Sequence, residues 1–143
     1  MVSFLQNARK VIVPLKERDN NIMDQGQDVP FLLLCAEGNL QAVRCSVYSE
    51  GFDINQGDKF KQTGLMWAAY HHRNDVFDFL LLHPGIDPTH RSNSGSTVLH
   101  EASEANNVHA LQMLFSHPKM VDEDIEAKNL EGKAAADLAR YLL

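Results

Sequence analysis

The sequence repeats itself at a fixed offset of 34 residues. The stretch Thr63–Ala69 recurs as Thr97–Ser103, and the same offset in the other direction leads to Val29–Cys35. Other positions keep this offset, namely Val43, Phe77 and Leu111; Val47, Leu81 and Phe115; and Asp53 with Asp87. A period of this length is typical of stacked repeat proteins, in which each unit packs on its neighbours.

One period contains two helical patterns. Thr63 opens an apolar stretch in which Ala68 and Ala69 are small enough for a short helix to press against its neighbours. After a polar break at 71–74, the segment 76–82 has the wide apolar face of a second helix. Pro84 and Gly85 end that helix. The sequence therefore predicts an all-α fold of helix, turn, helix and extended loop.

Several copies of this period resemble the ankyrin repeat, whose hallmark is T-P-L-H-x-A. Val29–Leu32 keeps the proline, Thr63–Met66 keeps threonine and leucine, and Thr97–His100 keeps threonine, leucine and histidine. Gly51–Asn55 is similar to the loop entry G-A-D-V-N of that family. The resemblance covers 29–143 and implies an ankyrin-repeat solenoid of about three full repeats with partial terminal units.

The repeat register divides the chain into units at 29–62, 63–96 and 97–133, with a partial unit at 134–143. The spacing from Asp87 to Asp124 is 37, so three extra residues are expected near 119–123, in a loop. The last unit has no second helix to cover its leucines, which are Leu138, Leu142 and Leu143. Either further repeats or a domain follow Leu143, or a partner covers this end.

Residues 1–28 precede the first clear repeat. Ser3 is placed to cap a helix that carries Phe4, Ala8 and Val11 and ends before Pro14. We expect an N-terminal cap or degenerate half-repeat here, and a partly ordered tail is the alternative.

Composition narrows the class of partner. Thirteen Lys and Arg residues against 19 Asp and Glu give a net charge of −6, which argues against a nucleic-acid or anionic-membrane binder. No apolar run is long enough for a membrane span, and the first residues are too polar for a signal peptide. Cys35 and Cys45 fall at repeat-core positions and are expected to be buried free thiols of a reducing compartment. We therefore expect an intracellular, cytoplasmic protein, and the nucleus also fits.

Motifs for catalysis are missing from the sequence. It has no Gly-rich phosphate loop, no nucleophile elbow, no Cys-x-x-Cys and no His-Glu-x-x-His. His71 and His72 are adjacent, so they do not face each other on a helix and are a poor metal chelate. His83 and His117 each precede a proline at the end of a second helix, where a cationic imidazole would favour the helix dipole. We expect neither an enzyme nor a cofactor.

The resemblance also implies roles for two polar residues. In ankyrin-like turns, the residues at Thr97 and His100 hydrogen-bond to each other and fix the first helix, so His100 is expected to be structural; Met66 replaces it in the preceding repeat. An asparagine at the place of Asn55 can be hydroxylated by an asparaginyl hydroxylase in this family. The alternative role of Asn55 is a loop hydrogen bond.

Ankyrin-like solenoids bind partners on a concave surface made of loop tips and first helices. The candidate residues on that surface are Phe60, Trp67, Tyr70, His71, Arg91, Asn93, Glu101 and Glu104. Aromatic and arginine side chains dominate binding energy at interfaces, so we expect Phe60, Trp67, Tyr70 and Arg91 to form one patch. For Trp67 the alternative is sideways packing on the neighbouring repeat.

These features predict a protein–protein interaction module that binds a partner protein or peptide on its concave surface without catalysis. A rigid surface needs little reordering on binding, which limits the entropic cost of association. The alternative is that the chain is the targeting module of an enzyme whose catalytic domain lies outside it.

Overall fold

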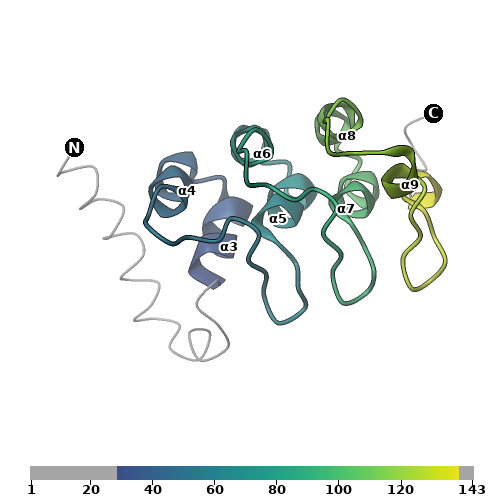
Figure 1. Ribbon diagram of the computed structural model, residues 1–143, viewed down its shortest axis with the longest axis horizontal. Coiled ribbons are helices and arrows are strands. Elements are labelled where there is room, and N and C mark those ends of the chain that lie inside the picture. Colours follow the sequence, from purple (N-terminus) through teal and green to yellow (C-terminus); the bar gives the residue numbers. More distant parts are fainter. Residues whose placement is uncertain (1–28, 139–143) are drawn as a thin grey trace.

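The computed structural model describes residues 29–138, which form a row of stacked helical repeats (Figure 1). The predicted N-terminal cap and the residues Leu142 and Leu143 lie outside the described part. The first helices of the repeats are α3 (Val29–Glu37), α5 (Gly64–Tyr70), α7 (Val98–Glu104) and α10 (Ala135–Leu138). The second helices are α4 (Leu40–Val47), α6 (Asn74–Leu81) and α8 (Val108–Phe115), and a one-turn helix α9 (Asp122–Ile125) follows α8.

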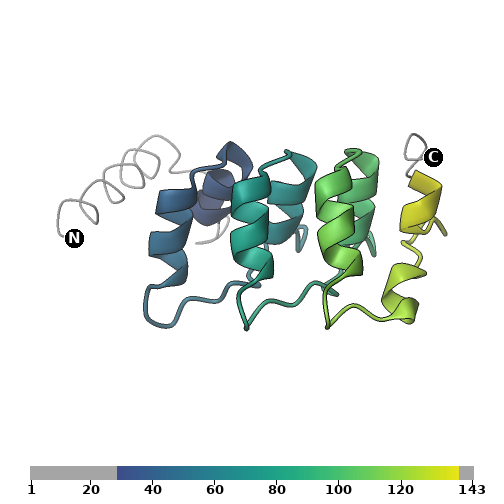
Figure 2. The ribbon, with the colours of Figure 1, turned by 90° about the horizontal axis from the view of Figure 1, so that it is seen from above.

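The helices form two layers. Helices α3, α5, α7 and α10 pack on one another in sequence to form the inner layer, and α6 contacts both α4 and α8 in the outer layer (Figures 1 and 2). Long loops leave the helices on the side opposite to the outer layer (Figure 1). The predicted all-α solenoid is confirmed. No helix within 29–138 has the length and apolar character needed to cross a membrane.

The 34-residue register explains which side chains form the core. Ala68 and Ala102 are buried at the same position of successive inner helices, and Val43, Phe77 and Leu111 are buried on the outer ones. The equivalent positions Val47, Leu81 and Phe115 at the ends of the outer helices differ in burial. Val47 and Leu81 are buried, whereas Phe115 is 53% exposed. Helix α6 packs beside α4, and α8 packs beside α6. Within the described part of the chain, no further outer helix packs beside α8, which is followed by the single turn of α9.

Threonine caps start the inner helices α5 and α7, as the repeat motif predicts. The Thr63 hydroxyl accepts a hydrogen bond from the amide of Met66 (3.3 Å). At Thr97 the amide donates to Nδ1 of His100 (3.0 Å), and Nε2 of His100 donates to the carbonyl of Lys133 (2.9 Å). His100 is 1% exposed, so its predicted structural role is confirmed.

The expected cationic role of His83 and His117 is wrong. Nδ1 of His83 accepts a hydrogen bond from the amide of Gly85 (3.0 Å), and Nδ1 of His117 accepts one from the amide of Lys119 (3.1 Å). A nitrogen that accepts carries no proton, so both rings are neutral in this arrangement. They shape the turn after the outer helix instead of pairing with the helix dipole as cations.

The two cysteines have different environments. Both are free thiols, as predicted. Cys35 is fully buried, and burial raises the pKa of its thiol well above its usual range. The prediction of burial is wrong for Cys45, which is partly exposed. Cys45 lies midway between Val43 and Val47 on α4, about 200° around the helix from each, so it turns away from the buried face.

Three hairpin loops project from the inner layer, at 58–62, 92–96 and 129–133. Each is closed by a hydrogen bond between its end residues, from the amides of Asp58, Ser92 and Asn129 to the carbonyls of Gln62, Ser96 and Lys133. The predicted three-residue insertion falls between the second and third hairpin loops, where α9 forms.

Asn55 lies just before the first hairpin loop, and its side chain binds the backbone of the next repeat. Its side-chain amide donates to the carbonyl of Gly85 (2.8 Å), and its carbonyl oxygen accepts from the amide of Asp87 (2.8 Å). Both the amide nitrogen and the oxygen of the side chain therefore make loop hydrogen bonds, which is the alternative role predicted for Asn55. Hydroxylation of Asn55 stays a prediction.

Replacing Lys61 by glycine is expected to stabilise the protein. Lys61 has a φ of 60°, and its counterparts in the other hairpin loops are Gly95 and Gly132, both with a φ of 77°. A lysine in the left-handed region is strained by about 1–2 kcal/mol, while glycine adds unfolded-state entropy, so we expect a net gain of roughly 0.5–1 kcal/mol. Chemical denaturation measures it. Lys59→Gly, in the same loop but without a positive φ, is the control and should give no gain.

Candidate binding groove

A groove of about 1020 Å³ lies between the inner helices and the hairpin loops. Its lining includes Trp67, Tyr70 and His71 at the end of α5, and Glu101 and Glu104 on α7. The second and third hairpin loops complete it. We call this surface the groove.

The repeat register explains why aromatic and acidic side chains meet in the groove. Trp67 and Glu101 occupy the same position of α5 and α7, and so do Tyr70 and Glu104. A spacing of three residues keeps each pair on one side of its helix. Since α5 packs directly on α7, a short aromatic row lies beside a short acidic row.

The aromatic side chains are stacked on one another. The ring centroids of Trp67 and His71 are 5.9 Å apart with nearly parallel planes (28°). The rings of Tyr70 and His71 are nearly perpendicular (78°), with centroids 5.4 Å apart. Trp67 is partly buried and packs against the core, so its predicted groove exposure and its sideways packing are both present in part. The indole Nε1 is buried and has no hydrogen-bond acceptor among the described residues.

The acidic row carries charge that the described residues do not neutralise. Within 29–138, the salt bridges are His109–Asp78 and Lys133–Glu131, and neither Glu101 nor Glu104 takes part in one. Burial, and then the charge of Glu104, raise the pKa of Glu101 to about 7. Glu101 therefore changes charge near neutral pH.

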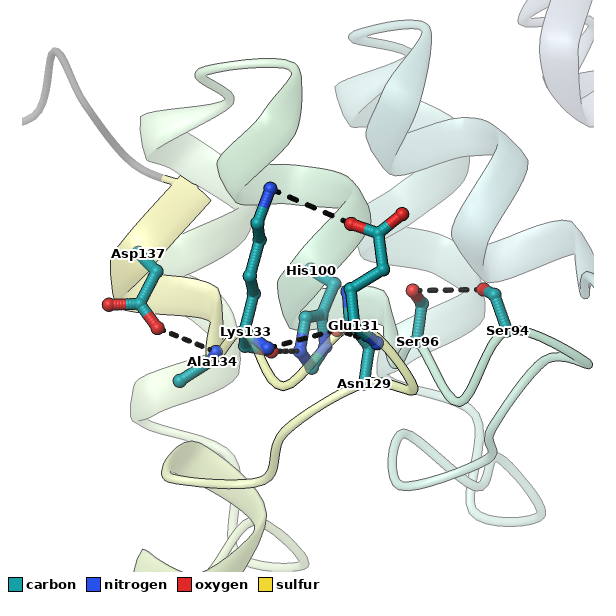
Figure 3. Close-up of polar contacts among 8 residues, drawn as sticks. All are labelled: Ser94, Ser96, His100, Asn129, Glu131, Lys133, Ala134 and Asp137. Carbon is teal, nitrogen blue, oxygen red and sulfur yellow. Dashed lines mark hydrogen bonds and ion pairs between the residues drawn. The ribbon is translucent and has the colours of Figure 1, made fainter.

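The third hairpin loop lines part of the groove, and its polar contacts are drawn in Figure 3. Its Lys133 ammonium lies 3.6 Å from the Glu131 carboxylate, and the Lys133 carbonyl accepts the hydrogen bond from His100. The Asp137 carboxylate accepts from the amide of Ala134 (2.9 Å) and starts α10. The hydrogen bond between His100 and Lys133 ties the hairpin loop to α7, the helix that carries the acidic row.

Three of the predicted binding residues lie on or directly before the first two hairpin loops and do not line the groove. Phe60 is 54% exposed at the tip of the first hairpin loop. Arg91 donates to the carbonyls of Gly95 (3.2 Å) and Lys128 (3.0 Å), and the side chain of Asn93 donates to the carbonyl of Lys59 (3.2 Å). Arg91 and Asn93 thus connect neighbouring hairpin loops. The expected patch is divided, because Trp67 and Tyr70 line the groove whereas Phe60 and Arg91 do not.

Sequence reasoning missed the contribution of the third hairpin loop. Leu130, Glu131 and Lys133 line the groove, and Leu130 is 78% exposed. Leu130 is the counterpart of Asn93 once the offset is corrected from 34 to 37. Counting with the offset of 37 after the insertion would have placed Leu130 among the candidate binding residues.

His71 and His72 have separate roles. His71 stacks on Trp67, while Nε2 of His72 is 2.7 Å from the carbonyl of Ala105 in the next repeat. In the described part of the chain, no group of three or more histidine, cysteine, aspartate or glutamate side chains is arranged to hold a metal ion.

Comparisons with known proteins agree with this architecture. The model of the family "Ankyrin repeats (3 copies)" matches residues 31–129 of the 143. An ankyrin repeat domain-containing protein of Stachybotrys chartarum is 22% identical over 131 residues, which cover 88% of this chain and 7% of that protein. A putative ankyrin repeat protein of Acanthamoeba polyphaga mimivirus is 31% identical over 94 residues, 63% of this chain and 13% of that protein. The chain therefore belongs to the ankyrin-repeat family.

Proposed function

We propose that the chain is a protein-binding module that holds a partner protein or peptide in the groove and carries out no catalysis itself. Ankyrin repeats are generally protein–protein interaction modules and are generally non-catalytic. The observation that carries the proposal is the groove, where partly exposed aromatic side chains lie beside carboxylates that lack a counter-ion among the described residues. A cytoplasmic setting is part of the proposal, because Cys35 and Cys45 are free thiols.

The groove supports this function better than the outer face does. Tyr48 and Leu82 are more exposed than any groove aromatic, at 68% and 72%, but they lie at the ends of the outer helices α4 and α6 and do not line the groove. Trp67 and Tyr70 combine apolar area with polar edges inside a concave site, which is the usual setting of residues that dominate binding energy.

Replacing Trp67 and Tyr70 together by alanine is expected to abolish partner binding. Loss of two central aromatic anchors costs about 2 kcal/mol or more each, which is over a hundredfold in affinity. Affinity capture followed by quantitative mass spectrometry should identify proteins retained by the wild type and lost with this variant. A thermal melt of the same samples checks that the repeats remain folded.

The matched control replaces Tyr48 and Leu82 by alanine on the outer layer. It removes similar apolar area and should leave capture unchanged. Capture that survives the Trp67/Tyr70 change but is lost in the control would place the partner on the outer face and contradict the proposal.

A further inference from the structure

We propose that the groove binds an arginine side chain of an extended partner peptide, held by the carboxylates of Glu101 and Glu104 beside the indole of Trp67. This inference rests on the proposed function and specifies the chemistry of the partner. It depends on the charge, the aromatic neighbours and the orphaned indole nitrogen of the groove.

The charged groups of the groove indicate that the ligand carries a positive charge. The charged or titratable groups that line the groove are Glu101 and Glu104 from α7, Tyr70 from α5 with His71 directly after it, and Glu131 with Lys133 from the third hairpin loop. Glu131 and Lys133 neutralise each other at 3.6 Å. The two carboxylates of α7 remain. Glu101 is partly buried, so a cation in contact stabilises its charge more than it does at the exposed Glu104.

The aromatic neighbours favour a guanidinium over an ammonium. A guanidinium is planar and weakly hydrated, it stacks on indole and phenol rings, and its five donors reach two carboxylates at once. Trp67 and Tyr70 stand beside Glu101 and Glu104, so the groove offers both kinds of contact. An ammonium would gain the charge but lose the stacking.

The indole nitrogen favours a peptide over a free cation. Nε1 of Trp67 is buried without an acceptor in the described chain, and an unsatisfied donor costs about 1–3 kcal/mol. A peptide carbonyl that reaches this nitrogen supplies an acceptor, which a free cation does not. Leu130, 78% exposed at the rim, provides an apolar contact for a neighbouring side chain of the peptide.

Binding is expected to weaken as the pH falls through 7. A bound guanidinium favours the ionised form of Glu101, whose pKa is about 7 in the free protein. Only about a tenth of Glu101 is ionised at pH 6, against most of it at pH 8, so the affinity should fall by about tenfold between these values. His71 lies in the same groove, so the control is Glu101→Gln, which should remove the part of the pH dependence that belongs to Glu101.

The test uses a capped synthetic peptide of alternating alanine and arginine and an otherwise identical peptide with citrulline, the neutral isostere, in each arginine position. Trp67 is the only tryptophan of the chain, so its fluorescence reports binding at the groove itself. We expect the arginine peptide to bind about ten- to a hundredfold more tightly than the citrulline peptide, and a lysine peptide to fall between them.

Two double variants locate the effect. Glu101→Gln with Glu104→Gln should abolish the preference for arginine over citrulline. The control, Glu123→Gln with Glu126→Gln, makes the same change in net charge at exposed positions that do not line the groove and should keep the preference. Equal loss in both would assign the effect to overall charge and overturn the proposal.

Other results also overturn the inference. Equal binding of the arginine and citrulline peptides, or binding of neither, removes arginine as the ligand, and tighter binding of the lysine peptide removes the guanidinium. The proposed protein-binding function can hold even where the arginine inference is contradicted. If captured partners are lost with the Trp67/Tyr70 variant but retained with the Glu101/Glu104 variant, the groove is the binding site and arginine is not what it recognises.

Discussion

Replacing His100 by leucine is expected to lower the free energy of unfolding by about 3 kcal/mol. The ring is buried, and its two nitrogens serve the amide of Thr97 and the carbonyl of Lys133. Leucine fills a similar volume but leaves both backbone groups without their partner, and each unsatisfied buried group costs about 1–3 kcal/mol. Urea denaturation measures the change, provided that the slope of the transition stays the same.

The control for this change is His109→Leu. The ring of His109 is 40% exposed and pairs with Asp78 at 2.7 Å on the outer layer. Surface pairs contribute about 0–1 kcal/mol, so the same substitution should cost under about 1 kcal/mol there. If both variants lose equal stability, the buried contacts of His100 are not what matters. Hydrogen exchange should also quicken in 129–133 for His100→Leu, since the third hairpin loop loses its tie to α7.

Replacing Asn107 by alanine is expected to cost about 2–3 kcal/mol. Its carbonyl oxygen accepts from the amide of Ala110 (3.0 Å) at the start of α8. Its amide group donates to the carbonyl of Ala69 (2.9 Å) and to the side chain of Asn74 (3.2 Å), both in the preceding repeat. The residue is 2% exposed, so water cannot replace these contacts. Thermal and chemical denaturation both report the loss.

Asn39 offers a matched control for this cap. It stands at the same repeat position, 68 residues earlier, and caps α4 through the amide of Ala42 (3.2 Å). It makes no side-chain bond to another repeat among the described residues. Asn39→Ala should therefore cost only about 1 kcal/mol, the usual value of a helix cap. Equal costs at the two sites would mean that the contacts of Asn107 across the repeat boundary contribute nothing.

The fold could be predicted from the sequence because it is a local and repeated pattern. Thr97 and His100 interact within one turn, and the core positions Phe77 and Leu111 follow from helical spacing inside each unit. Details at the end of the row were not predictable in this way. Phe115 keeps the register of Leu81 but not its burial, since burial depends on which helix packs next and not on the residue itself.

The candidate site was predictable only where it follows the repeat. Trp67 and Glu101 were found because they share a register position on packed helices. Arg91 has the sequence character of a binding residue, yet its donors are used by a carbonyl 37 residues away, a contact that no local pattern reveals. Leu130 was missed for the opposite reason, because the insertion moved it out of the 34-residue register. The raised pKa of Glu101 depends on burial, which is a property of the assembled groove.

Among the residues 29–138, the hydrogen bonds between repeats join each unit to its neighbour. Asn55, His72 and Asn107 each reach one repeat along the row. A pulling force applied to the two ends would therefore load these boundaries in series, and the weakest would part first while the others kept their shape. A ligand that touches both α5 and α7 would reinforce the boundary beneath it and direct mechanical failure elsewhere in the row.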